Sequence, residues 1–187
     1  MSDFTHNFEA DTGKILNIVI NSLYSDRDIF LRELLSNASD AIHKRKFLGQ
    51  TRPNILNAVD DEIQIIMDPK KKTIEIIDTG IGFSETDLSE TLGTIARSGT
   101  SSFIDELDSA DNSHDAAKTL IGQFGVGFYS AFMVADRVVV TTRKAGSDQS
   151  HVWESDGKSG YSISTNDTIG EVGTSIKLYL RKDSKEY

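Results

Sequence analysis

The sequence contains no cysteine and only two prolines among its 187 residues. Without cysteine the chain can form neither a disulfide framework nor a cysteine-based metal site or nucleophile, which fits a reducing compartment. No apolar run approaches the length that spans a bilayer, and the first residues, MSDFTHNFEADTGK, lack the basic start and apolar run of a signal peptide. The hydrophobic fraction of 37% is that of an ordinary globular chain that can bury one core.

Basic residues are outnumbered, because 20 Lys and Arg stand against 29 Asp and Glu. The net charge of −9 disfavours non-specific binding to nucleic acid, which requires a basic surface. A phosphate ligand would need local devices: backbone N–H groups, a nearby cation or a metal. The last residues, RKDSKEY, are typical of the start of a linker, so we expect one domain over residues 1–187, with a linker beginning at 181–187, within a longer protein.

Hydrophobic periodicity predicts helices first and hairpins last. Helices are predicted over residues 12–24, 26–48, 85–95, 100–107 and 127–135, with a polar, acidic stretch over 108–119. Strands are predicted over residues 62–67, 73–78, 137–142, 151–155, 161–165 and 174–180. This order predicts an α+β fold, a two-layer sandwich with helices packed on one face of a mainly antiparallel mixed sheet.

The predicted helix over residues 26–48 carries a narrow polar stripe. At 100° per residue, the side chains of Glu33, Asn37, Asp40 and Lys44 fall within an arc of about 60°, opposite an apolar face. The spacing alone favours a solvated surface face. Asn, however, is a mediocre helix former, and its carbonyl oxygen can bind a hard cation, while a Glu carboxylate can accept a proton from water.

Asp78 ends an apolar strand and is followed by TGIG. A partly buried carboxylate at that place needs hydrogen-bond donors, and an adenine amino group is one such donor. Gly80 and Gly82 would allow a flat ring to approach the backbone. An ordinary turn built from Asp and Gly is the alternative interpretation.

The stretch LIGQFGVGFYSAF, residues 120–132, places glycines at 122, 125 and 127 before an apolar helix. The spacing G-x-x-G-x-G and the polar residues before it do not match the dinucleotide-binding fingerprint, which follows a strand. A glycine-rich loop that enters a helix can still offer bare N–H groups to an anion. A helix cap with a close packing contact is the alternative.

In this order, RELLSNASDA, DTGIG, GTIARSGT and IGQFGVGFYSAF closely resemble the N-terminal ATP-binding domain of the 90-kDa heat-shock chaperone family, and VWES resembles its bacterial or organellar members. That family belongs to the GHKL ATPase superfamily, with type II topoisomerases, mismatch-repair ATPases and histidine kinases. The resemblance implies a Bergerat-type ATP-binding fold, ATP and Mg²⁺ as cofactors, and a lid over about residues 93–127 whose glycines cradle the phosphates.

The resemblance also implies a role for each matching residue. Glu33 would be the general base that activates water, and Asn37 would hold magnesium through its side-chain oxygen. Asp78 would read adenine, with Thr174 near it through water, and Phe128 would line the nucleotide pocket. The remaining ATP-binding residues implied are Asp40, Ala41, Lys44, Gly82, Phe83, Leu92, Arg97, Ser98, Gly122, Gln123, Phe124, Gly125, Val126 and Gly127.

Three positions depart from the usual pattern of that family. Phe83 stands where Met is usual, Thr91 where Asn is common, and Arg97 where Lys is usual beside the phosphates. A guanidinium can still serve beside phosphates, with a different geometry. The departures bear on ribose and inhibitor contacts rather than on ATP binding itself.

By resemblance, the chain is expected to be the Mg-dependent ATPase domain of a molecular chaperone, weak or inactive alone because hydrolysis needs a cation from a downstream domain. The expected partners are ATP and ADP, with client proteins and co-chaperones reached through a full-length homodimer, the domain itself being monomeric without ATP. No nucleic acid or membrane partner is expected, and the expected location is the cytoplasm or an organellar matrix.

Three other functions remain open on the sequence. A nucleotide-gated binding module would bind ATP with negligible turnover. A topoisomerase or mismatch-repair relative is disfavoured by the acidic charge. A histidine kinase would need a phosphoacceptor histidine domain, and the scattered histidines fit no such unit or metal site; they are His6, His43, His114 and His151.

Overall fold

The structure, a computed structural model, describes residues 4–6, 27–56, 60–93, 127–158, 160–166 and 170–184. Its strands form one sheet in the order β1-β6-β5-β4-β7-β3-β2. The strands are β1 Phe4–His6, β2 Ile63–Asp68, β3 Thr73–Asp78, β4 Ala135–Arg143, β5 Ser150–Ser155, β6 Tyr161–Asn166 and β7 Gly173–Leu180. The helical elements are α2 Ile29–Gly49, η1 Pro53–Ile55, α3 Glu85–Leu92 and η2 Gly127–Met133.

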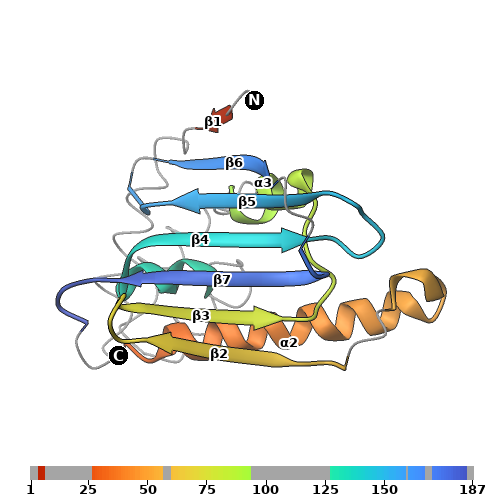
Figure 1. The fold of residues 1–187 in the computed structure, drawn as a ribbon, viewed down its shortest axis with the longest axis horizontal. Coiled ribbons are helices and arrows are strands. Elements are labelled where there is room, and N and C mark those ends of the chain that lie inside the picture. Colours follow the sequence, from red (N-terminus) through yellow and green to blue (C-terminus); the bar gives the residue numbers. More distant parts are fainter. Residues whose placement is uncertain are drawn as a thin grey trace, which may run out of the picture.

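The molecule has two layers, because α2, α3 and η2 all lie behind the sheet while no described helix lies in front of it (Figure 1). This arrangement confirms the predicted α+β sandwich. Every described strand pair is antiparallel. This confirms the mainly antiparallel sheet, whereas the mixed character that was expected is not found among the described strands. Parallel neighbours need a crossover that brings the chain back in the same direction, and no such crossover joins neighbouring strands among the described residues.

Most predicted elements are found within two residues of their expected bounds. The helix expected over 85–95 ends earlier, at Leu92, where Gly93 caps it through its N–H to the Ser89 carbonyl. The buried helix expected over 127–135 is present as the shorter 3₁₀ helix η2, which ends at Met133. Each of its residues is buried, and the Ser130 hydroxyl donates to the Gly127 carbonyl at 2.5 Å, a local bond that fits the tighter turn.

Some expectations fall on other parts of the chain. The helices expected over 12–24 and 100–107, and the polar stretch over 108–119, lie outside the described residues. The short elements β1 and η1 were not predicted, because three-residue segments carry too little periodicity to register.

Side-chain hydrogen bonds to the backbone fix the start of α3 and the turn between β2 and β3. The Ser84 hydroxyl accepts from the Asp87 N–H, and the Asp87 carboxylate accepts from the Ser84 N–H, which forms a capping box at the start of α3. In the hairpin between β2 and β3, the Asp68 carboxylate accepts from the N–H groups of Lys70 and Lys71, both at 3.0 Å. These bonds fix the turn that places Asp78 at the far end of β3.

The core lies between the helices and the inner face of the sheet. From α2, Leu34 is fully buried against the sheet side, while η2 contributes Phe128, whose ring meets the Trp153 ring edge-on at 5.5 Å. This packing fixes α2 along β3 and brings η2 beside α2. Among the helices of the described residues, none is long and apolar enough to cross a membrane.

Candidate functional site

The polar stripe of α2 stays on the side of the helix that does not pack into the core. Glu33 is half-buried, while Asn37, Asp40 and Lys44 are exposed. Ala41, which follows Asp40, is also half-buried and contacts the turn after β3. The predicted stripe therefore exists, and it runs along α2 from Glu33 to Lys44.

Asp78 is a buried carboxylate at the end of β3, with 5% of its surface exposed. Its Oδ1 accepts from the Gly80 N–H at 2.8 Å, whereas no described residue donates to its Oδ2. Burial raises the pKa of Asp78 to about 6, against the lowering effect of the Gly80 N–H and of the Arg45 charge. A carboxylate with one unsatisfied oxygen in such a place can accept a hydrogen bond from a ligand.

Two threonines lie beside Asp78 on the inner face of the sheet. Thr174 stands directly opposite Asp78 in the β3–β7 register, and Thr142 stands opposite Thr174 in the β4–β7 register. The Thr142 hydroxyl donates to the Gly173 carbonyl at 2.8 Å and accepts from the Phe83 N–H at 3.0 Å. Its remaining contact is with the Thr174 hydroxyl at 3.1 Å, so Thr174 is the donor in that pair.

The turn between β3 and α3 packs tightly against α2. The Ile81 N–H donates to the Ala41 carbonyl at 3.1 Å, and a Cβ added to Gly80 would lie 2.5 Å from both the Ala41 Cβ and the Asp78 Oδ1. Gly82 has a φ of +67° and a Cβ there would overlap the Arg143 carbonyl. Only glycine fits at positions 80 and 82, and the turn that these residues form holds Asp78 next to Ala41.

The other end of the stripe meets the start of η2. A Cβ added to Gly127 would lie 2.7 Å from the Glu33 Oε2, so the glycine leaves room for this carboxylate. The other Glu33 oxygen forms a partly exposed ion pair with Arg32 at 3.3 Å. Glu33, the predicted base, therefore lies beside the last glycine of the predicted phosphate cradle.

The structure brings together the predicted residues of α2 and of the β3–α3 turn. Thr174, on β7, lies beside them because it pairs with Asp78. Leu92 is buried, and its carbonyl accepts from the Tyr129 hydroxyl at 2.6 Å. Phe128 lies in the core against Tyr129 and Trp153, with 5% exposed. The predicted residues that lie outside the described part of the chain are Arg97, Ser98, Gly122, Gln123, Phe124, Gly125 and Val126.

Sequence reasoning missed two residues of this region. Thr142 had no signal, because its role depends on strand pairings that the sequence does not reveal. Arg45 did carry one: at 100° per residue from Glu33 it lies at about 120°, on the apolar face, and the structure buries it there with 2% exposed. No group of three His, Asp or Glu side chains that could hold a metal occurs in the described ranges.

A cavity of about 380 Å³ lies where β3, β7 and β4 carry Asp78, Thr174 and Thr142, and all three residues belong to its lining. Its lining includes Gln64, Ile77, Thr141 and Ser175, which alternate with the inward-facing residues and are in register with one another, and the loop at 170–172 closes one side. The cavity therefore adjoins the candidate site, while these other lining residues belong to the outer face of the sheet.

Comparison with known proteins adds two findings. Residues 24–169 match the family model described as histidine kinase-, DNA gyrase B-, and HSP90-like ATPase. The chaperone protein HtpG of Roseobacter denitrificans is 50% identical over 184 residues, covering 98% of this chain and 29% of the relative. That of Wolinella succinogenes is 50% identical over 183 residues, covering 97% and 29%, and that of Rhodospirillum rubrum is 48% identical over 188 residues, covering 100% and 30%. The chain thus spans less than a third of the length of these relatives.

Proposed function

Because the chain belongs to the family of histidine kinase-, DNA gyrase B- and HSP90-like ATPases, we propose that it binds ATP between α2, the β3–α3 turn and η2, and that it hydrolyses ATP when the rest of its protein completes the site. The relatives are named chaperones, so the nucleotide would drive a chaperone that assists client proteins. Closure of a lid over about residues 93–127 and dimerisation of the full-length protein are parts of the same proposal.

The observation that supports the proposal most directly is the hydrogen bonding of the buried Asp78 carboxylate. Its Oδ1 is held by the Gly80 N–H and its Oδ2 has no partner among the described residues. Adenine offers an exocyclic amino group, a donor suited to that oxygen, and the glycine turn lets a planar base come close to the backbone. The Thr174 hydroxyl, directly opposite Asp78, would add a contact to the base through water.

The length of α2 separates the two ends of the ligand. Ala41 adjoins the Asp78 turn and Glu33 adjoins Gly127, and eight residues of helix span about 12 Å along the axis. A nucleotide laid along α2 would have its base at Asp78 and its phosphates near Asn37 and Gly127. The acidic chain supplies few cations there, so backbone N–H groups and a metal would carry the phosphate charge.

In this arrangement each side chain of the stripe has one task. Asn37 would offer its side-chain oxygen to Mg²⁺, which when bound neutralises phosphate charge and prefers oxygen ligands. Glu33 would take a proton from the attacking water, a role that its half-buried carboxylate beside Gly127 allows. Lys44 and Asp40, both exposed, would contact the nucleotide at the solvent-facing edge of the site.

Calorimetric titration with ATP, with and without Mg²⁺, tests the proposal on this chain. We expect binding that strengthens with Mg²⁺ for ATP, and weaker Mg²⁺ dependence in Asn37→Ala, which removes the amide oxygen on an exposed part of α2. Ser36→Ala, an exposed neighbour on the same helix, is the matched control. Absence of ATP binding by the folded wild-type chain would refute the proposal; binding without turnover, even in the longer protein, would make it a nucleotide-gated binding module.

A further inference from the structure

Arg45 is buried in α2 although arginine is almost never fully buried unless it is paired. Only 2% of its surface is exposed, and its Nη2 donates to the Asp61 Oδ1 at 2.6 Å. Its Nε and Nη1 have no hydrogen-bond partner in the part of the chain that the structure describes. Unpaired buried N–H groups are costly, so one ion pair does not explain why this charge lies in the core.

The position of Arg45 relates it directly to Asp78. Arg45 lies one helical turn after Ala41, which contacts Gly80, whose N–H binds the Asp78 carboxylate. On the other side, Asp61 lies two residues before Ile63, and Ile63 stands opposite Asp78 in the β2–β3 register. Arg45 and its partner therefore occupy the space beside the strand end that carries Asp78.

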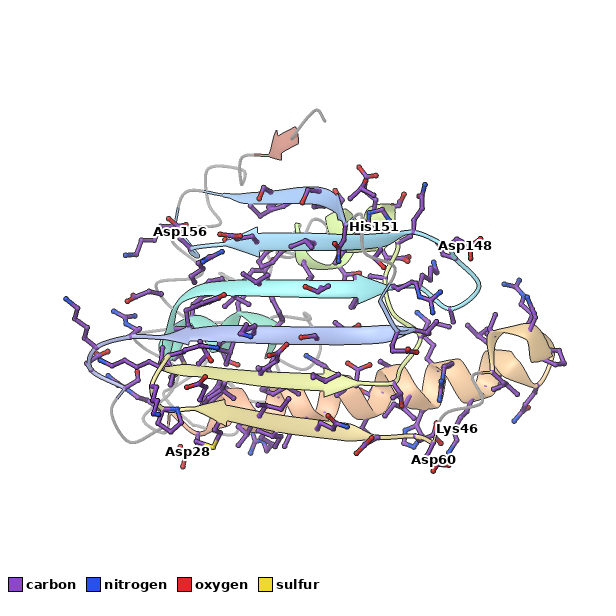
Figure 2. The ribbon with its side chains drawn as sticks, in the orientation of Figure 1. Asp28, Lys46, Asp60, Asp148, His151 and Asp156 are labelled. Carbon is purple, nitrogen blue, oxygen red and sulfur yellow. The ribbon has the colours of Figure 1, made fainter. Side chains whose placement is uncertain are left out.

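The charge of Arg45 is only partly cancelled. Asp61 is shared, because the Lys46 ammonium also binds it, at 2.5 Å; Lys46 lies at the same end of the molecule as Asp60 (Figure 2). Two cations thus face the Asp61 carboxylate. Asp60 and Glu62, on either side of Asp61, are exposed, so solvent and salt screen their charges more than that of the buried Arg45. From β7 and β4, the residues in register with Asp78 are Thr174 and Thr142, which are neutral.

We propose that Arg45 is a positioning residue for the nucleotide site, whose buried positive charge keeps Asp78 ionised so that it can accept a hydrogen bond from the amino group of the base. This inference rests on the proposed ATP-binding function and adds a determinant of base recognition outside the contact surface. Burial favours the neutral carboxyl and raises the pKa of Asp78 to about 6, while the Arg45 charge lowers that pKa. Without Arg45 the pKa of Asp78 would rise toward neutral pH, and a larger fraction of the empty sites would hold a protonated acid.

The first test follows the carboxyl ¹³C resonance of Asp78 with pH in the nucleotide-free chain, assigned by its loss in Asp78→Asn. We expect an inflection near pH 6 in the wild type. Arg45→Gln, which keeps a polar planar group for Asp61, should move the inflection up by about one pH unit. Arg45→Lys keeps the charge and should leave the inflection near that of the wild type. An unmoved inflection in a folded Arg45→Gln chain would overturn the proposal.

The second test measures ADP affinity as a function of pH. If the pKa of Asp78 rises by about one unit, Arg45→Gln should lose affinity about threefold at pH 6.5 and almost nothing at pH 8. Loss by the same factor at both pH values would show that Arg45 is merely structural and would contradict the proposal. If Arg45→Gln does not fold, Arg45→Met takes its place in both measurements, because it removes the same charge and leaves Asp61 paired with Lys46.

The two proposals fail in distinguishable ways. If the wild-type chain binds no adenine nucleotide, the proposed function fails, while the carboxyl titration still decides whether Arg45 controls the Asp78 charge. If the wild type binds ADP with a pH dependence that Arg45→Gln does not shift, the role of Arg45 fails and the ATP site stands. Asp61→Asn should shift the Asp78 titration in the opposite direction. It removes the counter-charge of Arg45 and should therefore move the inflection to lower pH.

Discussion

Asp78→Asn tests the site through stability as well as through binding. In the wild type, burial raises the pKa of Asp78 from 3.8 to about 6. The folded chain therefore binds the proton more tightly than the unfolded chain does, and the free energy of unfolding falls as the pH rises from about 4 to about 6. Above pH 6 the folded chain carries the full penalty of an ionised buried carboxylate, which Asn does not have.

The size of this penalty follows from the pKa values. A shift from 3.8 to about 6 corresponds to about 3 kcal/mol, an upper figure, because the new Asn amide also needs a partner. We expect urea unfolding of the nucleotide-free chain at pH 8 to show Asp78→Asn as the more stable protein by up to about 3 kcal/mol. At pH 4 the advantage should be largely gone, since the wild-type carboxyl is then protonated.

Nucleotide binding should respond in the opposite direction. The Asn amide can present a donor to the amino group of adenine, and two facing donors repel; we expect ATP and ADP affinity to fall by about 3 kcal/mol, roughly a hundredfold in Kd. Asp148→Asn, in the exposed hairpin between β4 and β5 (Figure 2), makes the same chemical change away from the site and should alter neither quantity. If Asp78→Asn binds ATP as the wild type does, Asp78 does not read the base.

Three further predictions concern other parts of the fold. Glu33→Ala should retain ATP affinity yet lose turnover in a form of the protein that hydrolyses ATP, because a base acts in the transition state; equal loss of binding and turnover contradicts this role. Gly127→Ala should displace the Glu33 carboxylate, which lies 2.7 Å from the added Cβ, and lower kcat more than affinity; steady-state kinetics with unchanged kcat would show that the contact is irrelevant. Ser84→Ala should lower the free energy of unfolding by about 1 kcal/mol through loss of the α3 cap, whereas Ser36→Ala, exposed on α2, should change it little in the same urea experiment.

The sequence predicted those features that depend on local pattern. The bounds of β3 were predicted to the residue, and the polar stripe of α2 follows from its helical period. The form of η2 was not predictable from spacing, because its apolar residues fit either type of helix and the buried Ser130–Gly127 bond depends on burial by the whole fold. A mainly antiparallel sheet was predicted, but not that every described strand pair is antiparallel, since the pairing of β7 with both β3 and β4 joins segments far apart in the chain.

The candidate site was likewise predictable where it depends on local pattern and not where it depends on contacts between distant residues. Asp78 and its glycines were recognisable as a motif, but the fact that one carboxylate oxygen is satisfied and the other is not comes only from the structure. Arg45 was visible in the periodicity as a charge on the apolar face, yet a helical projection cannot say what lies opposite. The β2–β3 register and the shared Asp61 give that charge its neighbour.

Asp78 also connects base recognition to the start of the proposed lid. The turn from Asp78 to Ser84 is tightly packed. Gly80 lies against Ala41 and Gly82 against the Arg143 carbonyl. The helix α3 follows directly, with its capping box at Ser84. Lys144, next to Arg143, binds the Asp87 carboxylate of that box at 2.6 Å, so α3 is tied to the β4–β5 hairpin. An empty site that holds an ionised, half-satisfied carboxylate is at a disadvantage that a bound base removes, and a ligand that binds only the folded chain stabilises it. The stabilisation is applied at the turn that fixes α3, and α3 ends at Leu92, where the segment proposed as the lid begins.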